Sequence, residues 1–322
     1  MNVLVCSAGR RAKIVEYLKK ELKSVNGKVI ATDCDRNAPA LYFADDIEIV
    51  PKVDSSNYIE AILDICRKHK INSIFSLIDP ELEILASHKN LFDENQIKLI
   101  QSPLETIQIC FDKQKTYDSL QKLSLPGVPT YSDINKVEEL IDSGELKYPL
   151  IVKPRKGSAS IGIEVIYSKN ELVNIFSKDD NLIIQPYYKE REFGIDVYID
   201  LLNGELIDIF IKEKLRMRSG ETDKSISIHN NRIEALIKDF ILKFNFKGPI
   251  DIDCFEYNGE YYISEVNPRF GGGYPHAYEM GCNFMEYILC NIKGEQNKGY
   301  SGYKYNKGYI MMKYDEILLQ KL

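Results

Sequence analysis

The most informative stretch of this chain is residues 251–275, DIDCFEYNGEYYISEVNPRFGGGYP. Two runs of strand-forming residues flank Asn258-Gly259, a pair that predicts a β-hairpin. The second run ends in polar residues, and buried polar groups are costly unless they are paired or bind a ligand. Carboxylate and amide oxygens are the ligands that Mg²⁺ prefers. The stretch therefore predicts a Mg²⁺ site made by Asp253, Glu265 and Asn267.

The turn of this hairpin decides whether those side chains meet. Because side chains alternate along a strand, a two-residue loop would place the acids of the two strands on opposite faces. A three-residue loop over 257–259, with Gly259 in the left-handed conformation, would bring the polar residues to one face. We therefore expect the three-residue loop, with this set on one face: Asp251, Asp253, Glu265 and Asn267. A solvated hairpin face with scattered acids is the alternative.

The composition excludes several classes of function. Of the 322 residues, 44% are hydrophobic and 28% are charged, as in soluble globular proteins. The net charge of -6 argues against a nucleic-acid partner, which needs clustered Lys and Arg. No apolar run reaches the ~20 residues that span a bilayer, and the chain starts with a strand pattern instead of a leader, so we expect no membrane partner. Seven cysteines without a CxxC pair favour reduced thiols and a cytoplasmic location.

The first hundred residues alternate between strand and helix patterns. Such alternation predicts a parallel sheet with helices on its faces. The first turn, Ser7 to Arg11, lacks the GxGxxG pattern of dinucleotide-binding folds. Arg10 and Arg11 begin the first helix, where cations are disfavoured unless an anion binds nearby; solvated arginines are the alternative. The expected strands lie near residues 3–5, 29–31, 47–50, 73–78 and 98–100, with helices at 58–70 and 81–92.

The middle of the chain carries the features of a phosphate site. A helix predicted near 107–123 contains Lys113, and Pro126 to Pro129 break the chain after it. Strands near 150–154 and 163–167 flank the loop RKGSASIG, whose backbone N–H groups and hydroxyls can wrap phosphates. This loop is not a Walker loop, because no GK[ST] follows it. An amphipathic helix over 231–246 contributes to the core.

In this order the parts resemble the ATP-grasp superfamily over nearly the whole chain. They are similar to one half of the carbamoyl-phosphate synthetase large subunit, to biotin-carboxylase-like ligases and to stand-alone carboxylate–amine ligases. The resemblance implies an α/β ATP-grasp fold with an N-terminal Rossmann-like pre-ATP-grasp domain, a small lid domain and a C-terminal α+β domain. The implied boundaries are 1–105 for the first domain, 106–185 for the linker helix and lid, and 186–322 for the domain with the metal and substrate site.

The resemblance also assigns cofactors and residues. It implies ATP and two Mg²⁺ ions, which Mn²⁺ can replace, with Asp253, Glu265 and Asn267 as metal ligands. The chain departs from the family pattern at two positions. The hinge segment of family members often begins with Glu, whereas here it begins with Gln185, and Asp251 stands where D-alanine ligases carry an arginine. The second departure disfavours D-alanine–D-alanine ligation. The implied ATP-binding residues are Lys113, Lys153, Lys156, Ser158, Ser160, Gln185, Pro186, Tyr187, Tyr188 and Glu192.

The implied chemistry is ligation of a carboxylate to an amine through an acyl phosphate, with release of ADP and phosphate. Arg269 would stabilise the oxyanion of acyl transfer. Arg216 and Arg218 would hold the substrate carboxylate, or else form a solvated strand edge, and His276 is a candidate base. The alternatives are a bicarbonate-phosphorylating enzyme and a non-catalytic ATP-binding module. The expected partners are a small carboxylate and a small amine, whose identities the sequence does not give; a homodimer is left open.

Overall fold

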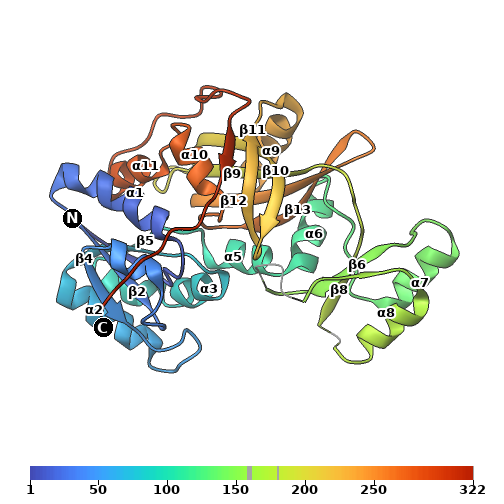
Figure 1. Ribbon diagram of the computed structural model, residues 1–322, viewed down its shortest axis with the longest axis horizontal. Helices are drawn as coiled ribbons and strands as arrows, with labels where there is room; N and C mark the ends of the chain where they lie inside the picture. Colours follow the sequence, from blue (N-terminus) through green and yellow to red (C-terminus); the bar gives the residue numbers. More distant parts are fainter. Residues whose placement is uncertain (158–161, 180, 322) are drawn as a thin grey trace.

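The computed structural model describes residues 1–157, 162–179 and 181–321, which form three β-sheets with helices packed on them (Figure 1). One sheet is parallel and the other two are antiparallel. This mixed α/β architecture confirms the predicted fold class. Within the described residues, no helix is both long and apolar enough to cross a bilayer.

The N-terminal sheet confirms the predicted alternation of strands and helices. Its five strands run parallel in the order β3-β2-β1-β4-β5. The helix expected over 81–92 is two helices, because the His88 ring bonds to the Ile84 carbonyl and the His88 N–H bonds to Leu85 instead. The elements are β1 (Asn2–Cys6), α1 (Ala12–Leu22), η1 (Lys23–Val25), β2 (Lys28–Asp33), η2 (Pro39–Phe43), β3 (Asp46–Ile49), α2 (Tyr58–His69), β4 (Ile71–Ser76), α3 (Asp79–Ser87), α4 (Lys89–Glu94) and β5 (Lys98–Leu99).

The helix expected over 107–123 is also broken. It forms α5 (Leu104–Phe111) and α6 (Lys113–Lys122), because Asp112 between them is extended. The Asp112 carboxylate accepts the backbone N–H groups of Gln114 and Lys115, which caps the start of α6. The break places Lys113 at the first residue of a helix.

A small three-stranded sheet follows, in the order β7-β6-β8. Its antiparallel register sets Lys153 opposite Ile183 and Gln185 opposite Ile151. Two short helices complete this unit, at the right of Figure 1. The elements are α7 (Ile134–Asp142), β6 (Leu150–Pro154), β7 (Glu164–Ile166), α8 (Lys169–Phe176) and β8 (Leu182–Pro186).

The largest sheet is antiparallel, in the order β13-β12-β9-β10-β11-β14. The predicted amphipathic helix forms as α9 and buries Ile233, Ile237 and Phe240 in the core beside this sheet. The elements are β9 (Glu192–Ile199), β10 (Leu206–Arg218), β11 (Glu221–Ser227), α9 (Asn231–Lys243), β12 (Gly248–Tyr257), β13 (Glu260–Asn267), α10 (Tyr274–Glu279), α11 (Phe284–Ile292) and β14 (Ile310–Met312).

The hairpin of β12 and β13 brings the acids to one face as expected, but through a β-bulge and not through the predicted three-residue loop. Its turn has two residues, Asn258 and Gly259, both with positive φ (52° and 75°), so the prediction of a three-residue loop is wrong. The register instead shifts further along the strands: Cys254 pairs with Ile263, whereas Asp253 pairs with Glu265. Ser264 is therefore the extra residue of a β-bulge, which restores the shared face that the two-residue turn would have lost.

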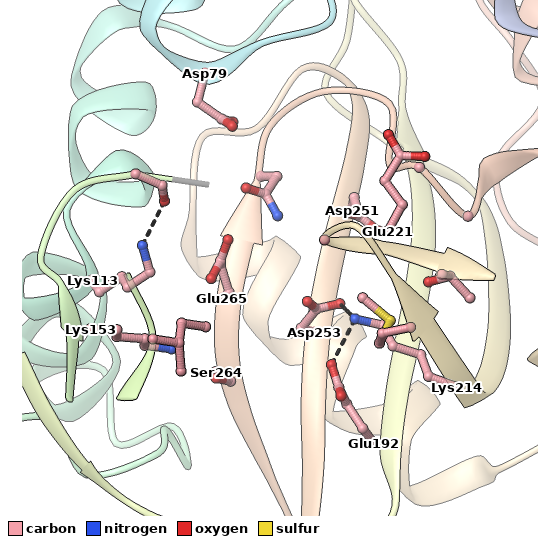
Figure 2. Close-up of a pocket in the computed structure, with 18 of the residues that line it drawn as sticks. Asp79, Lys113, Lys153, Glu192, Lys214, Glu221, Asp251, Asp253, Ser264 and Glu265 are labelled. Carbon is pink, nitrogen blue, oxygen red and sulfur yellow. Dashed lines mark hydrogen bonds and ion pairs between the residues drawn. The ribbon is translucent and has the colours of Figure 1, made fainter. Parts of the chain in front are cut away.

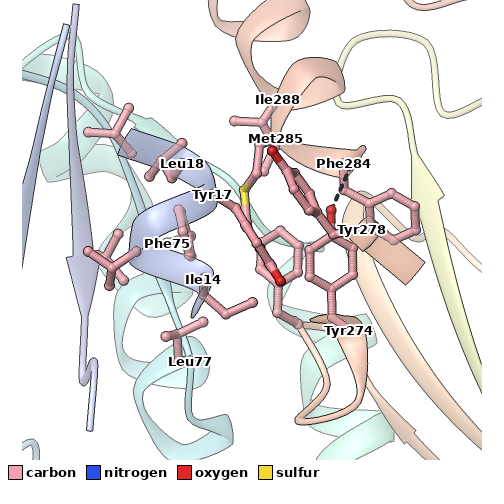
Figure 3. Close-up of a cluster of buried hydrophobic side chains, with 14 of the residues drawn as sticks. Ile14, Tyr17, Leu18, Phe75, Leu77, Tyr274, Tyr278, Phe284, Met285 and Ile288 are labelled. Carbon is pink, nitrogen blue, oxygen red and sulfur yellow. Dashed lines mark hydrogen bonds between the residues drawn. The ribbon is translucent and has the colours of Figure 1, made fainter. Parts of the chain in front are cut away.

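A continuous core joins the N-terminal sheet to the last helices. Helix α1 lies between them, and Ile14 and Leu18 belong to the same buried cluster as Phe284 (Figure 3). The Tyr17 ring stacks on Tyr278 with centroids 3.7 Å apart. Because this packing fixes the N-terminal sheet against the largest sheet, side chains from both can form one site. Each of the three predicted domains contains one sheet, and the exact boundaries remain a prediction.

Candidate functional site

A cleft of about 790 Å³ lies where the three sheets meet. Its walls come from the β1–α1 turn, the start of α6, strands β6 and β8, and the facing strands of the largest sheet. Most of the residues predicted to bind nucleotide or metal line it, although they are spread over more than 150 positions of sequence. Those residues are Lys113, Lys153, Gln185, Pro186, Tyr187, Tyr188, Glu192, Asp253, Glu265 and Asn267, and the predicted catalytic residue Arg269 lines the cleft as well.

Lys113 and Lys153 form one wall of the cleft (Figure 2). The Arg155 side chain donates to the Asp112 carboxylate at 2.8 Å, and the Lys113 N–H donates to the Arg155 carbonyl, so the start of α6 is fixed beside the end of β6. The Lys113 ammonium donates to the Gly157 carbonyl at 2.7 Å. Burial lowers the pKa of Lys153. An anion beside Lys153, such as a phosphate, would stabilise the charged form that burial disfavours.

The phosphate loop is described only in part. Lys156 is exposed and does not line the cleft as described; its ammonium lies 5.7 Å from the centre of the Phe111 ring. Ser158 and Ser160 fall outside the described residues. The predicted phosphate contacts of these three residues stay untested.

The segment from Gln185 to Tyr188 lines the cleft beside strand β6. The Gln185 amide donates to the Thr130 hydroxyl at 2.8 Å and is buried, which leaves backbone groups and ring faces for a base. Tyr188 stacks on Tyr257 with centroids 4.3 Å apart.

The predicted metal ligands lie on one face, as expected. Asp253 and Glu265 are direct cross-strand partners, and Asn267 is opposite Asp251. Burial alone would raise the pKa of Glu265, but the positive charges of Lys113 and Lys153 outweigh it and lower that pKa. Asp253 Oδ1 is buried and lies 2.6 Å from the ammonium of Lys214, so this carboxylate has one positive partner from the protein itself. Two facing carboxylates and an amide beside the two lysines are a donor set that fits Mg²⁺.

Lys214 is a central residue that the sequence analysis missed. Its side chain is 5% exposed, and its ammonium lies 2.6 Å from Asp253 and donates to Glu192 at 2.8 Å (Figure 2). These carboxylates raise the pKa of Lys214 although burial opposes them, so the ammonium stays charged. Lys214 must cross β9 to reach β12, and a Cβ at Gly194 would lie 3.1 Å from the Lys214 stem. The signal in the sequence is Gly194 itself, a glycine inside a strand-forming run, which indicates that another group approaches the backbone closely; the register that places it between Lys214 and Asp253 arises only on folding.

Arg269 is also paired, with a residue that the sequence analysis did not select. Its guanidinium donates to Asp79 Oδ2 through Nη2 at 2.7 Å and through Nε at 3.1 Å. Both side chains are buried and both line the cleft. The pair joins the first residue of α3 to the segment after β13, so Arg269 has a structural role as well as access to the cleft.

The structure does not bring Arg216, Arg218 or His276 to the cleft lined by the described residues. Arg216 and Arg218 lie on the exposed end of β10, and Arg218 pairs with Asp223 at 3.0 Å and with Asp315. They occupy the solvated strand edge that was the alternative prediction. His276 is buried against Ser225, and burial lowers its pKa to about 4.

Arg10 and Arg11 reach the cleft from the β1–α1 turn instead. Both guanidinium groups lie 3.5 Å from Glu221, and Arg11 donates to the Phe270 carbonyl at 2.7 Å. The glycines that follow Arg269 leave space for this end of the cleft. A Cβ at Gly271 would lie 2.4 Å from the Asp251 carboxylate, and one at Gly272 would lie 2.7 Å from Glu221.

Comparison with protein families agrees with this geometry. Residues 110–273 match the model of the ATP-grasp domain, and residues 3–100 match the model described as the PylC-like N-terminal domain. The chain belongs to the ATP-grasp family. This assignment confirms the predicted resemblance.

Individual relatives are more distant. The chain is 27% identical over 234 residues to the carbamoyl phosphate synthase large chain of Clostridium beijerinckii, which covers 67% of this chain and 21% of that protein. It is 28% identical over 182 residues to D-alanine–D-alanine ligase A of Bacillus cereus, covering 50% of this chain and 56% of the relative. The fold resembles the biotin carboxylase domain of Hydrogenobacter thermophilus 2-oxoglutarate carboxylase, with a TM-score of 0.77, 17% identity, and coverage of 96% and 73% of the two chains.

Proposed function

We propose that this ATP-grasp protein is an ATP-dependent ligase that joins a carboxylate to an amine through an acyl phosphate and releases ADP and phosphate. One observation carries the proposal. Two lysines, two facing carboxylates and a buried arginine share a single cleft, with Lys113 and Lys153 on one wall and Asp253, Glu265 and Arg269 facing them. ATP and a small carboxylate are chemically complementary to these two sides of the cleft.

Each side of the cleft has a task in the proposed reaction. Lys113 and Lys153 hold the phosphates, Gln185 to Tyr188 hold the adenine, and Glu192 accepts hydrogen bonds from the ribose hydroxyls. Mg²⁺ held by Asp253, Glu265 and Asn267 would neutralise charge on the transferring phosphoryl group. The Arg269 guanidinium stabilises the oxyanion that develops when an amine attacks the acyl phosphate. Because Asp79 occupies one side of this guanidinium, Arg269 is held in place before substrate binds.

The relatives support the proposal and suggest one alternative. One relative is named as a ligase of two D-alanine units. The carbamoyl phosphate synthase relative and the biotin carboxylase domain, determined with MgADP and bicarbonate, favour a bicarbonate-phosphorylating enzyme as the second candidate. A non-catalytic ATP-binding module is disfavoured because the predicted metal ligands and Arg269 all line one cleft.

ADP release measured with pooled amino acids, other small carboxylates and amines tests the proposal. We expect turnover that requires one carboxylate and one amine together. ADP release with bicarbonate alone would favour the second candidate, and nucleotide binding without any ADP release would contradict both. A cytoplasmic location and a homodimer belong to the same proposal; light scattering would determine the oligomeric state.

A further inference from the structure

The end of the cleft away from Lys113 and Lys153 contains a carboxylate shared by three cations. Arg10 and Arg11 each lie 3.5 Å from Glu221 Oε1, and the Lys313 ammonium lies 3.1 Å from Glu221 Oε2. The three cations come from the β1–α1 turn and from the segment after β14, at opposite ends of the chain. Glu221, Arg10 and Arg11 line the cleft.

The two arginine contacts with Glu221 are loose. Hydrogen bonds between charged groups usually measure about 2.7–2.9 Å, shorter than the 3.5 Å found here. Arg10 donates instead to the Ser219 carbonyl at 2.8 Å, and Arg11 donates to the Phe270 carbonyl. Each guanidinium therefore keeps its position through a backbone carbonyl while its bond to a carboxylate is incomplete.

This end of the cleft carries one more positive than negative charge, so one further anion would balance it. The cations are Arg10, Arg11, Lys313 and Arg269, whereas the neighbouring acids are Glu221, Asp79 and Asp251. Asp79 is engaged by Arg269. Burial lowers the pKa of Arg11, and the nearby positive charge of Arg269 lowers it further, so a further negative charge would be stabilised beside these two groups.

We propose that Arg10 and Arg11 form the binding site for the substrate carboxylate, and that Glu221 occupies this site as an exchangeable internal carboxylate. A bound carboxylate displaces Glu221 from both guanidinium groups, and Lys313 then retains Glu221 as its counter-ion. The bound group lies beside Arg269, where the acyl phosphate of the proposed reaction would form. The inference rests on the proposed function only for that last step, since carboxylate binding does not require turnover.

Glu221, Lys313 and Arg11 each predict a different effect on carboxylate binding. Glu221→Gln removes the competing anion and should tighten binding by up to about 5-fold, the range of a partly exposed ion pair. Lys313→Met removes the cation that draws Glu221 away from the arginines, so binding should weaken by a similar factor. Arg11→Met should abolish binding. Arg36→Met, an exposed arginine outside the cleft, is the matched control and should change nothing.

Acetate is the probe, added in place of chloride at constant ionic strength while the rise in Tm is recorded. ADP binding to each variant is measured by calorimetry, so that failure of the nucleotide site is distinguished from failure of the carboxylate site. Weaker acetate binding in Glu221→Gln would overturn the exchange and would indicate that Glu221 itself contacts substrate. An unchanged response in Arg11→Met also overturns the proposal; if that variant does not fold, Arg10→Met, at a half-exposed position, must show the loss.

Discussion

Arg269 donates two hydrogen bonds to the same oxygen of Asp79, at 2.7 and 3.1 Å, across 190 positions of sequence. The pair is buried at the junction between the N-terminal domain and the segment that follows β13. Breaking a buried pair by removing one partner leaves the other charge uncompensated, at a cost of about 3–5 kcal/mol. Arg269→Ala should therefore lose stability as well as ligation.

Two variants separate these effects. The double variant Asp79→Asn, Arg269→Gln should recover most of the free energy of unfolding in urea, because neither charge is then left unpaired. It should still bind ADP within a few-fold of the parent and still fail to ligate, since Arg269 acts mainly in the transition state. Full ligation by the double variant would remove Arg269 from the mechanism.

Lys214→Met tests the buried cation between Glu192 and Asp253. Leaving these carboxylates without their partner should cost roughly 1–3 kcal/mol, so Tm should fall. Added Mg²⁺ should restore more Tm in the variant than in the parent, because a divalent ion replaces the lost positive charge. Lys243→Met, on α9 outside the cleft, is the control. An equal Mg²⁺ effect in parent and variant would show that Lys214 does not share a carboxylate with the metal.

Glu265→Gln tests the metal. The variant keeps the shape of the side chain but removes the charge that faces Lys113 and Lys153, so ADP release should fall by roughly 100-fold or more while the fold persists. Chelation of divalent ions should stop ADP release by the parent, and Mn²⁺ should restore it. Near-normal turnover in a folded Glu265→Gln protein would show that this carboxylate is not a metal ligand.

Gly271→Ala tests the close approach to Asp251. Its added methyl group meets the Asp251 carboxylate at 2.4 Å, and such overpacking costs typically about 1–3 kcal/mol. We expect lower stability and slower ligation with little change in ADP affinity, measured by urea unfolding and calorimetry. A Cβ at Gly299 would meet the Glu205 carboxylate only at an ordinary van der Waals distance of 3.7 Å, so Gly299→Ala serves as the control. If both variants behave alike, close packing against Asp251 is not the reason for glycine at position 271.

The sequence predicted the sheet type, because local patterns specify strands. Most of the nucleotide and metal residues that it predicted line the cleft, because the order of motifs is specific to the family. The sequence did not show how the β12–β13 hairpin brings its acids to one face. A bulge at Ser264 compensates for the two-residue turn, and that bulge is visible only in the register of the folded strands. The sequence analysis also missed Lys214 and Asp79. Both act through partners on distant strands or helices, and such partners have no fixed spacing along the chain. Charge alone does not show which segment faces solvent, so it does not distinguish Arg216 and Arg218, which lie on an exposed strand end, from Arg10 and Arg11, which line the cleft.

The most direct test of the central claim follows the oxygen of the substrate. After the ADP-release screen identifies the acid, that acid is supplied with its carboxylate labelled with heavy oxygen, and the released phosphate is analysed by mass spectrometry. Activation through an acyl phosphate predicts that one labelled oxygen moves into phosphate for each ADP formed. Unlabelled phosphate, released at the same rate as ADP, would contradict the account.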